Sequence, residues 1–168
     1  MTRSIVMGGG GAATPDHAKL DPFWEDVKAA VPGLGEDHQV RSLGIDEETT
    51  GMILEFIKAK TKVATFSLPW VMAAEKHPET KPGTPVILTG YDGTPRAVVR
   101  ITSIRETTFG EIGPAETKLD GPPVQDPEVW LPLHRDYWNG LLSQYGKKCS
   151  DDMPVLVEPF ELLYFKEV

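Results

Sequence analysis

The stretch TPVILTGYDGTPRAVVRITSIRE, residues 84–106, contains two runs rich in β-branched side chains with a short turn between them. The Asp-Gly pair in the turn at residues 91–93 favours the positive φ angles of tight hairpins. In the second run, Ala97, Val99 and Ile101 share one face, and the alternating positions are mainly polar. The stretch therefore predicts an antiparallel pair of strands, the second of them half-buried.

The segments on either side extend this pattern. KVATFSL, residues 62–68, has the β-branched and aromatic composition of a short strand. Before it, Asp46 precedes EETTGMILEFIKAK, residues 47–60, which has acids in its first turn, an apolar stripe and a basic end, as expected of a helix. At the other end of the chain, residues 153–168 predict an apolar strand with a bulge or an edge at Pro159.

Two further helices are predicted from cap residues. Asp126 and Pro127 fit the cap and first position of a helix that continues to about Gly146. Five residues recur there at near-helical spacing: Val129, Leu133, Tyr137, Leu141 and Gln144. A shorter helix is expected within residues 21–33, with Asp21 as its cap.

Strands interleaved with helices and joined by hairpin-like connections predict an α+β fold, a small β-barrel with flanking helices. We expect one domain over residues 20–168, because 168 residues lie in the usual range of a single domain. Residues 1–19 are expected to be a flexible N-terminal extension. Their glycine run, residues 8–11, lacks the preceding strand and the following Lys-Ser or Lys-Thr of a phosphate-binding loop.

Composition excludes several classes of function. The net charge of −8 argues against broad attraction to phosphate backbones, which depends on clustered Lys and Arg. No apolar run approaches the length of a membrane span, so we expect a soluble protein without a membrane partner. The single cysteine, Cys149, favours a reducing compartment such as the cytoplasm and is expected to be inert. The four histidines lack paired ligand spacing, so neither a metal nor another cofactor is expected.

A local basic segment, KAKTKVATFSLPW at residues 58–70, contrasts with this acidic background. Lys58 is consistent with simple complementation of a helix C-terminus. In an extended chain Thr65 and Ser67 place two hydroxyls on one face, and Lys62 can join Thr65 if it lies in the turn before the strand. A lysine beside a hydroxyl can hold an anion or activate that hydroxyl as a nucleophile. A solvated lysine beside ordinary strand residues is the structural alternative.

The same segment, the hairpin, EVWLPLHRDYW and the terminal PVLVEPFELLY together resemble the ASCH family, most closely its branch of small bacterial proteins. ASCH domains are similar to PUA domains, small β-barrels associated with RNA, so the resemblance implies a PUA-like fold over residues 20–168. The family motif is Gly-x-Lys-x-x-Thr. Lys62 and Thr65 match its Lys and Thr, and Lys60 stands where Gly is expected.

The resemblance extends to an acid-glycine pair, Asp120-Gly121, ahead of a Trp-containing helix. The branch usually has Glu at the position of Asp120. Within the helix Trp130, His134, Tyr137 and Trp138 match the family pattern, and their spacing brings one or two of them to a cleft rather than to the core. His134 suits either acid-base chemistry or a structural hydrogen bond. Trp70 suits either stacking on a nucleobase or covering the barrel.

The resemblance implies binding of RNA or of a nucleoside or nucleotide in a cleft. We expect Lys62, Thr65 and Asp120 as the central residues, and as the catalytic residues if the protein is an enzyme, with Asp120 as an acid that orients the substrate. The residues expected to contribute to ligand binding are Lys60, Ser67, Trp70, Trp130, His134 and Tyr137. One alternative is a hydrolase, either an acetylcytidine amidohydrolase with Thr65 as nucleophile and Lys62 as base, or a ribonuclease. Another is a non-catalytic interaction module, so whether the protein is an enzyme stays open at this stage.

Overall fold

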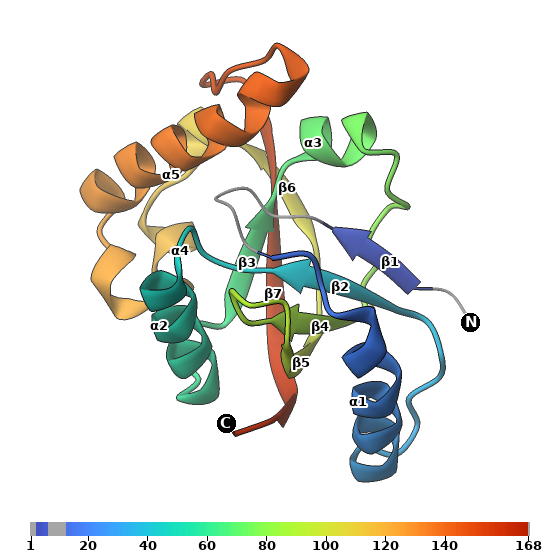
Figure 1. The fold of residues 1–168 in the computed structure, drawn as a ribbon. Helices are drawn as coiled ribbons and strands as arrows, with labels where there is room; N and C mark the ends of the chain where they lie inside the picture. The colour runs from blue at the N-terminus through green and yellow to red at the C-terminus, as the bar shows by residue number, and fades with distance from the viewer. Residues whose placement is uncertain (1–2, 7–12, 168) are drawn as a thin grey trace.

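Figure 1 shows the computed structural model of the chain, which describes residues 3–6 and 13–167. The strands of these residues form one mixed sheet in the order β1-β2-β4-β5-β7-β3, with β6 paired to β7. β2 lies parallel to β1 and β4, and the remaining pairs are antiparallel. The strands are β1 (Arg3–Val6), β2 (His38–Ser42), β3 (Ala64–Ser67), β4 (Pro85–Thr89), β5 (Pro95–Ile101), β6 (Arg105–Thr108) and β7 (Pro154–Phe165).

Helices lie on both sides of this sheet (Figure 1). They are α1 (His17–Ala30), α2 (Glu47–Lys58), α3 (Pro69–Ala74), α4 (Pro114–Thr117) and α5 (Pro127–Leu142), with 3-10 turns η1 (Phe109–Glu111), η2 (Pro122–Val124) and η3 (Ser143–Tyr145). None of the described helices is long and apolar enough to span a membrane. The predicted α+β fold, a small barrel with flanking helices, is confirmed: the sheet curves into a half-barrel.

The hairpin of β4 and β5 forms as predicted, with Gly93 at a φ of +84° in its turn. The predicted polar face of β5 is wrong at its centre, where Val98 is fully buried. Val98 and Ile87 pack against α1, whereas Val99 and Val86 pack against α2. Both faces of these strands are therefore covered, because the chain supplies a helix for each.

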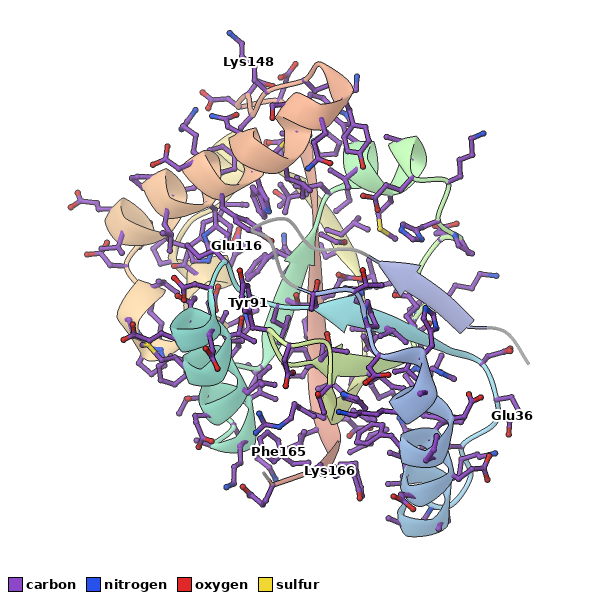
Figure 2. The ribbon with its side chains drawn as sticks, in the orientation of Figure 1. Glu36, Tyr91, Glu116, Lys148, Phe165 and Lys166 are labelled. Carbon is purple, nitrogen blue, oxygen red and sulfur yellow. The ribbon has the colours of Figure 1, made fainter. Side chains whose placement is uncertain are left out.

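The predicted helix at residues 47–60 is α2, and the side chain of its cap, Asp46, accepts a hydrogen bond from the Thr49 N–H at 2.7 Å. Lys58, in the last turn, pairs with Glu167, and its ammonium lies 5.4 Å from the centre of the Phe165 ring. Figure 2 labels Phe165 near the C-terminal end of β7, close to α2. The contacts of Lys58 thus attach the end of α2 to the C-terminal strand.

The N-terminal region differs from its prediction. Residues 3–6 of the expected flexible extension form β1, paired with β2, whereas residues 7–12, which include the glycine run, lie outside the described part of the chain. The first helix begins at His17 rather than after Asp21. Asp16 caps it by accepting from the Ala18 N–H at 3.2 Å. The earlier start adds Leu20 to the buried face of α1 and places Pro22 inside the helix.

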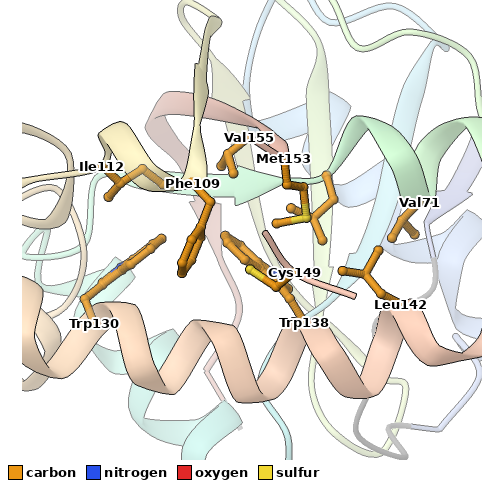
Figure 3. Packing of buried hydrophobic residues seen from close by; sticks show 10 residues of the cluster. Val71, Phe109, Ile112, Trp130, Trp138, Leu142, Cys149, Met153 and Val155 are labelled. Carbon is orange, nitrogen blue, oxygen red and sulfur yellow. The ribbon is translucent and has the colours of Figure 1, made fainter. Parts of the chain in front are cut away.

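The helix predicted from Asp126 and Pro127 is α5, but of the five residues predicted from their spacing only Tyr137 and Leu141 pack against the core. Val129 and Leu133 are 47% and 45% exposed. The buried side chains of α5 are Trp130, Trp138 and Leu142. Figure 3 shows them projecting from α5 towards Phe109, Met153 and the start of β7. Indole rings bury more apolar area than Val or Leu, which explains why the helix turns this face inward.

β7 joins the two parts of the curved sheet. Its first half pairs with β3 and β6, and its second half, from Phe160, pairs with β5. Pro159, where a bulge or an edge was predicted, lies at this change of pairing partner. The register of β7 against β5 then shifts between the partners of Val98 and Val99. Glu158, the residue before Pro159, forms an ion pair of 2.9 Å with Arg41 of β2. Because β4 and β5 separate β2 from β7 in the sheet, this contact requires strong curvature.

Candidate functional site

Lys62 lies in the turn between α2 and β3, where it was expected to lie if it joined Thr65. Its backbone N–H donates to the Phe56 carbonyl at 3.1 Å, and the next N–H, of Val63, donates to the Leu119 carbonyl at 2.9 Å. The second bond places the segment that contains Asp120 beside the start of β3. The Lys62 side chain is 8% exposed, and its Nζ donates to Asp120 Oδ1 at 2.8 Å.

Asp120 is a buried carboxylate with three donors. Besides Lys62, the Gly121 N–H donates to Oδ1 at 2.7 Å, and the Trp130 Nε1–H donates to Oδ2 at 2.9 Å. Burial opposes ionisation of the carboxyl group, but the Lys62 charge and these hydrogen bonds outweigh burial and hold the pKa of Asp120 below its usual value. Asp120 is therefore a fixed anion at neutral pH.

His134 stacks on Trp130 one helical turn earlier, with ring centres 3.7 Å apart. Its Nδ1 lies 2.9 Å from the Trp130 carbonyl oxygen and therefore carries the proton that this bond requires. Burial lowers the pKa of His134 to about 4, and the nearby Lys62 charge acts in the same direction. The ring is thus neutral at neutral pH, and its unprotonated Nε2 lies 3.9 Å from Asp120 Oδ2.

These groups border a cavity of about 340 Å³. Its wall includes the polar side chains of Thr49, Lys62, Thr65, Asp120 and His134. Among the described residues, the Thr65 hydroxyl has no hydrogen-bond partner, so it remains available to a ligand. Apolar and aromatic side chains form the rest of the wall; they include Ile45, Met52, Ile53, Phe56, Phe66, Leu133, Tyr137 and Trp138. The arrangement suits a planar ligand with polar edges.

The structure separates the remaining expected residues from the cavity wall. Lys60 is exposed at the end of α2. Ser67 lies further along β3, with its hydroxyl buried and unpaired within the described part of the chain. Trp70 packs on the cluster beneath α5, and the Lys147 ammonium lies 5.3 Å from its ring centre. Trp130 is fully buried and supports the site indirectly, through Asp120 and His134.

Sequence reasoning missed two aromatic residues of the wall, Phe56 and Phe66. Phe56 lies in the predicted helix and Phe66 in the predicted strand, and neither is among the expected site residues, yet both line the cavity. The glycine of the acid-glycine pair is the one sequence feature that bears on this wall: in the structure a Cβ on Gly121 would lie 2.6 Å from the Phe56 ring, so the pair marks a close approach to α2. The apolar residues Ile45, Met52 and Leu133 of the wall are also more than two-fifths exposed.

The thiol of Cys149 lies outside this site, and the described residues offer no metal site. Cys149 is buried in the cluster of Figure 3, where burial raises the pKa of its thiol. Within residues 3–6 and 13–167, no group of three or more His, Cys, Asp or Glu side chains is arranged to hold a metal ion.

Comparison with known proteins identifies the family. The ASCH domain profile matches residues 42–164, a range that contains every residue of the site. An ASCH domain from Lactobacillus crispatus has a similar structure, with a TM-score of 0.79 at 18% identity over 88% of this chain and 96% of that chain. A protein from Enterococcus faecalis V583 has a TM-score of 0.72 at 19% identity over 86% and 88% of the two chains. No curated protein sequence matches significantly. Because the profile match spans most of the sequence, this protein belongs to the ASCH domain family.

Proposed function

We propose that the protein binds a nucleoside, either free or as an unpaired residue of RNA, in the cavity beside Lys62. The observation that carries this proposal is the convergence of Lys62, Thr65, Asp120 and His134 on one aromatic-walled cavity. Its volume of about 340 Å³ lies at the lower end of the range typical of small-molecule sites, ~300–1,000 Å³. Aromatic walls favour a flat base, and the polar groups can bind its edge.

Charge favours the base over the phosphate backbone as the bound part. Lys62 is the only Lys or Arg among the residues that line the cavity, and its ammonium already pairs with Asp120. The whole chain carries a net charge of −8. Because binding along a nucleic-acid backbone requires several unpaired cations, a long RNA is expected to gain little affinity from its phosphates.

Calorimetric titration with a panel of nucleosides tests the proposal. The wild-type protein should bind at least one nucleoside, and Lys62→Met should weaken that binding at least about tenfold, because a charge-assisted hydrogen bond contributes roughly 1.5–3 kcal/mol. Lys147→Met is the matched control, since Lys147 lies over Trp70 and away from the cavity. A wild-type protein that binds no nucleoside, or equal weakening by both variants, would contradict the proposal.

A parallel titration with a single-stranded RNA separates base binding from backbone binding. If the base is the bound part, affinity should change little between low and physiological salt. A steep loss with salt, of the kind produced by several phosphate contacts, would indicate a backbone-binding surface instead. The same series on Lys147→Met measures any contribution from cations outside the cavity.

Hydrolysis of an acylated nucleoside is a second candidate, supported by the Thr65 hydroxyl. That hydroxyl faces the same cavity as Lys62 and has no partner among the described residues, as a nucleophile requires. Lys62 donates to Asp120 as an ammonium, so it is placed to stabilise developing negative charge. Incubation with acetylcytidine should release acetate if this activity exists. Turnover that persists in Thr65→Val would exclude Thr65 as the nucleophile.

A further inference from the structure

Two hydrogen-bond acceptors lie side by side in the cavity wall. Asp120 Oδ2 and His134 Nε2 are 3.9 Å apart, too far for a hydrogen bond with each other. Asp120 is an anion and has no proton to donate, whereas His134 has placed its ring proton on Nδ1, where it binds the Trp130 carbonyl. Both atoms therefore present lone pairs.

The orientation of His134 is fixed from two directions. Its ring lies nearly parallel to the Trp130 indole, at an interplanar angle of 15°, and its Nδ1–H binds the carbonyl of the same residue. Rotating the ring to place an N–H towards the cavity would lose that hydrogen bond. The low pKa of His134, which results from burial, keeps Nε2 unprotonated at neutral pH.

A donor lies on the other side of Asp120. Lys62 uses one N–H on Oδ1 of the carboxylate, and an ammonium carries three such donors. The cavity thus offers two acceptors followed by one donor. The complementary ligand edge has a group with two N–H donors next to an acceptor atom, which is the arrangement of the amino group and ring nitrogen of cytosine or adenine.

We propose that His134 determines base specificity, by accepting together with Asp120 the two N–H donors of an amino group and so selecting amino-bearing bases over their keto counterparts. This inference rests on the proposed nucleoside function. A keto oxygen at the same place would face two acceptors, leaving His134 Nε2 without a donor and Asp120 Oδ2 with the Trp130 indole alone. A site of this kind discriminates strongly, because the unmatched ligand strands buried polar groups.

Calorimetric titration of two ligand pairs, cytidine with uridine and adenosine with inosine, tests the inference. In the wild-type protein the better amino ligand should bind roughly tenfold more tightly than its keto partner. His134→Phe retains an aromatic ring against Trp130 but removes the acceptor, so the amino-to-keto ratio should fall towards one. Lys147→Met, which changes a residue over Trp70 and away from the cavity, should leave the ratio unchanged.

The ratio is measured within one protein sample, so partial unfolding of a variant does not alter it. If His134→Phe fails to fold, His134→Gln replaces it. The Gln amide can donate or accept a hydrogen bond, so the amino-to-keto affinity ratio should be smaller than in the wild-type protein. Equal binding of amino and keto ligands by the wild-type protein, or an unchanged ratio in the His134 variants, overturns the inference and leaves the nucleoside function standing. Absence of binding by all four nucleosides overturns both.

Discussion

Lys60 occupies a backbone position that usually selects glycine. Its φ is +62°, and it follows the last turn of α2. The Lys60 N–H donates to the Ile57 carbonyl at 3.0 Å, and the Thr61 N–H donates to the Phe56 carbonyl at 2.9 Å. These two bonds form the Schellman motif, in which the residue after the helix cap is left-handed. A left-handed turn, which a glycine at this position would favour, therefore forms here with a lysine.

Replacing Lys60 by Gly should stabilise the protein. A left-handed backbone costs a non-glycine residue roughly 1–2 kcal/mol, and the greater freedom of Gly in the unfolded chain offsets part of that gain. We expect a net increase of about 0.5–1 kcal/mol in the free energy of unfolding, measured with urea. Ala59→Gly is the control, because Ala59 has an ordinary φ of −74° and should lose stability. A loss in Lys60→Gly would contradict the strain argument.

Burial of neutral His134 should make stability depend on pH. Its pKa is lowered to about 4 in the folded protein from 6.5, so between these values the unfolded chain binds a proton that the folded protein rejects. The contribution of neutral His134 to the free energy of unfolding is therefore fully present above pH 6.5, and it is lost as the pH falls towards 4. Between pH 7.5 and 5.0 the loss from this group should be about 2 kcal/mol.

The charged groups around His134 do not change this sign. Asp120 favours protonation and Lys62 opposes it, and both contributions are included in the low pKa. The carboxyl group of Asp120, with its own lowered pKa, titrates below this window. Urea unfolding at both pH values should show the loss in wild type and in His17→Gln, whose side chain is exposed, but not in His134→Gln. An identical pH dependence in His134→Gln would refute the assignment.

Local signals in the sequence predict where Lys62 and Thr65 lie along the chain, but not the contact of Lys62 with Asp120. The turn that holds Lys62 follows from the end of α2 and the start of β3, and both are visible in the sequence. Asp120 entered through the family resemblance, because 58 residues separate it from Lys62 and no periodicity links the two. The supporting role of Trp130 was missed for the same reason: a hydrogen bond from a buried indole to a carboxylate leaves no pattern along the chain.

Among the elements, α5 shows where pattern alone becomes ambiguous. Val129 and Leu133 are spaced by four residues, and so are Trp130 and His134, so two neighbouring faces of the helix are equally regular. Packing against Phe109 and Met153 selects the Trp face. The other face of α5 points outwards, and its residue Leu133 borders the cavity. The N-terminus of the helix, by contrast, is predicted correctly, because Asp126 and Pro127 act locally.

Contact between α2 and the Asp120 segment can be tested with glycine substitutions. A Cβ on Gly121 would lie 2.6 Å from Phe56 Cδ2, so Gly121→Ala should destabilise the protein by about 1–3 kcal/mol and push Phe56 into the cavity. Gly51, inside α2, has open space around its Cβ position. Gly51→Ala should therefore stabilise by about 0.5–1 kcal/mol through helix propensity. Urea unfolding measures both changes, and the same sign for both would contradict the packing described here.

Across the whole molecule, the walls of the cavity come from segments that only the curved sheet brings together. Ser42 and Leu43, which follow Arg41 at the end of β2, line one side. Thr65, which is the register partner of Glu158, lines another. The Arg41–Glu158 pair therefore connects the two sides. The residues of this pair are 117 positions apart in sequence, and no strand signal predicts their contact.

The network around this pair is buried and well paired. Arg41 donates to both oxygens of Glu158, at 2.9 and 3.2 Å, and also to Gln39 Oε1 and Thr80 Oγ1. Glu158 is fully buried and Arg41 is 6% exposed. Removing one partner leaves a buried charge without compensation, which typically costs about 3–5 kcal/mol, whereas replacing both by apolar residues is often close to neutral.

We therefore expect Arg41→Met and Glu158→Leu each to lower the free energy of unfolding by about 3–5 kcal/mol. The double variant should lose less than either single one, about 1–3 kcal/mol, because Thr80 Oγ1 still accepts from the Gln39 amide and the Gln39 amide oxygen is the acceptor left without a donor. A double-mutant cycle by urea unfolding measures this coupling. Additive losses would show that the two charges act independently. A strongly coupled pair together with weakened nucleoside binding in the double variant would instead show that curvature of the sheet positions Thr65 against the opposite wall.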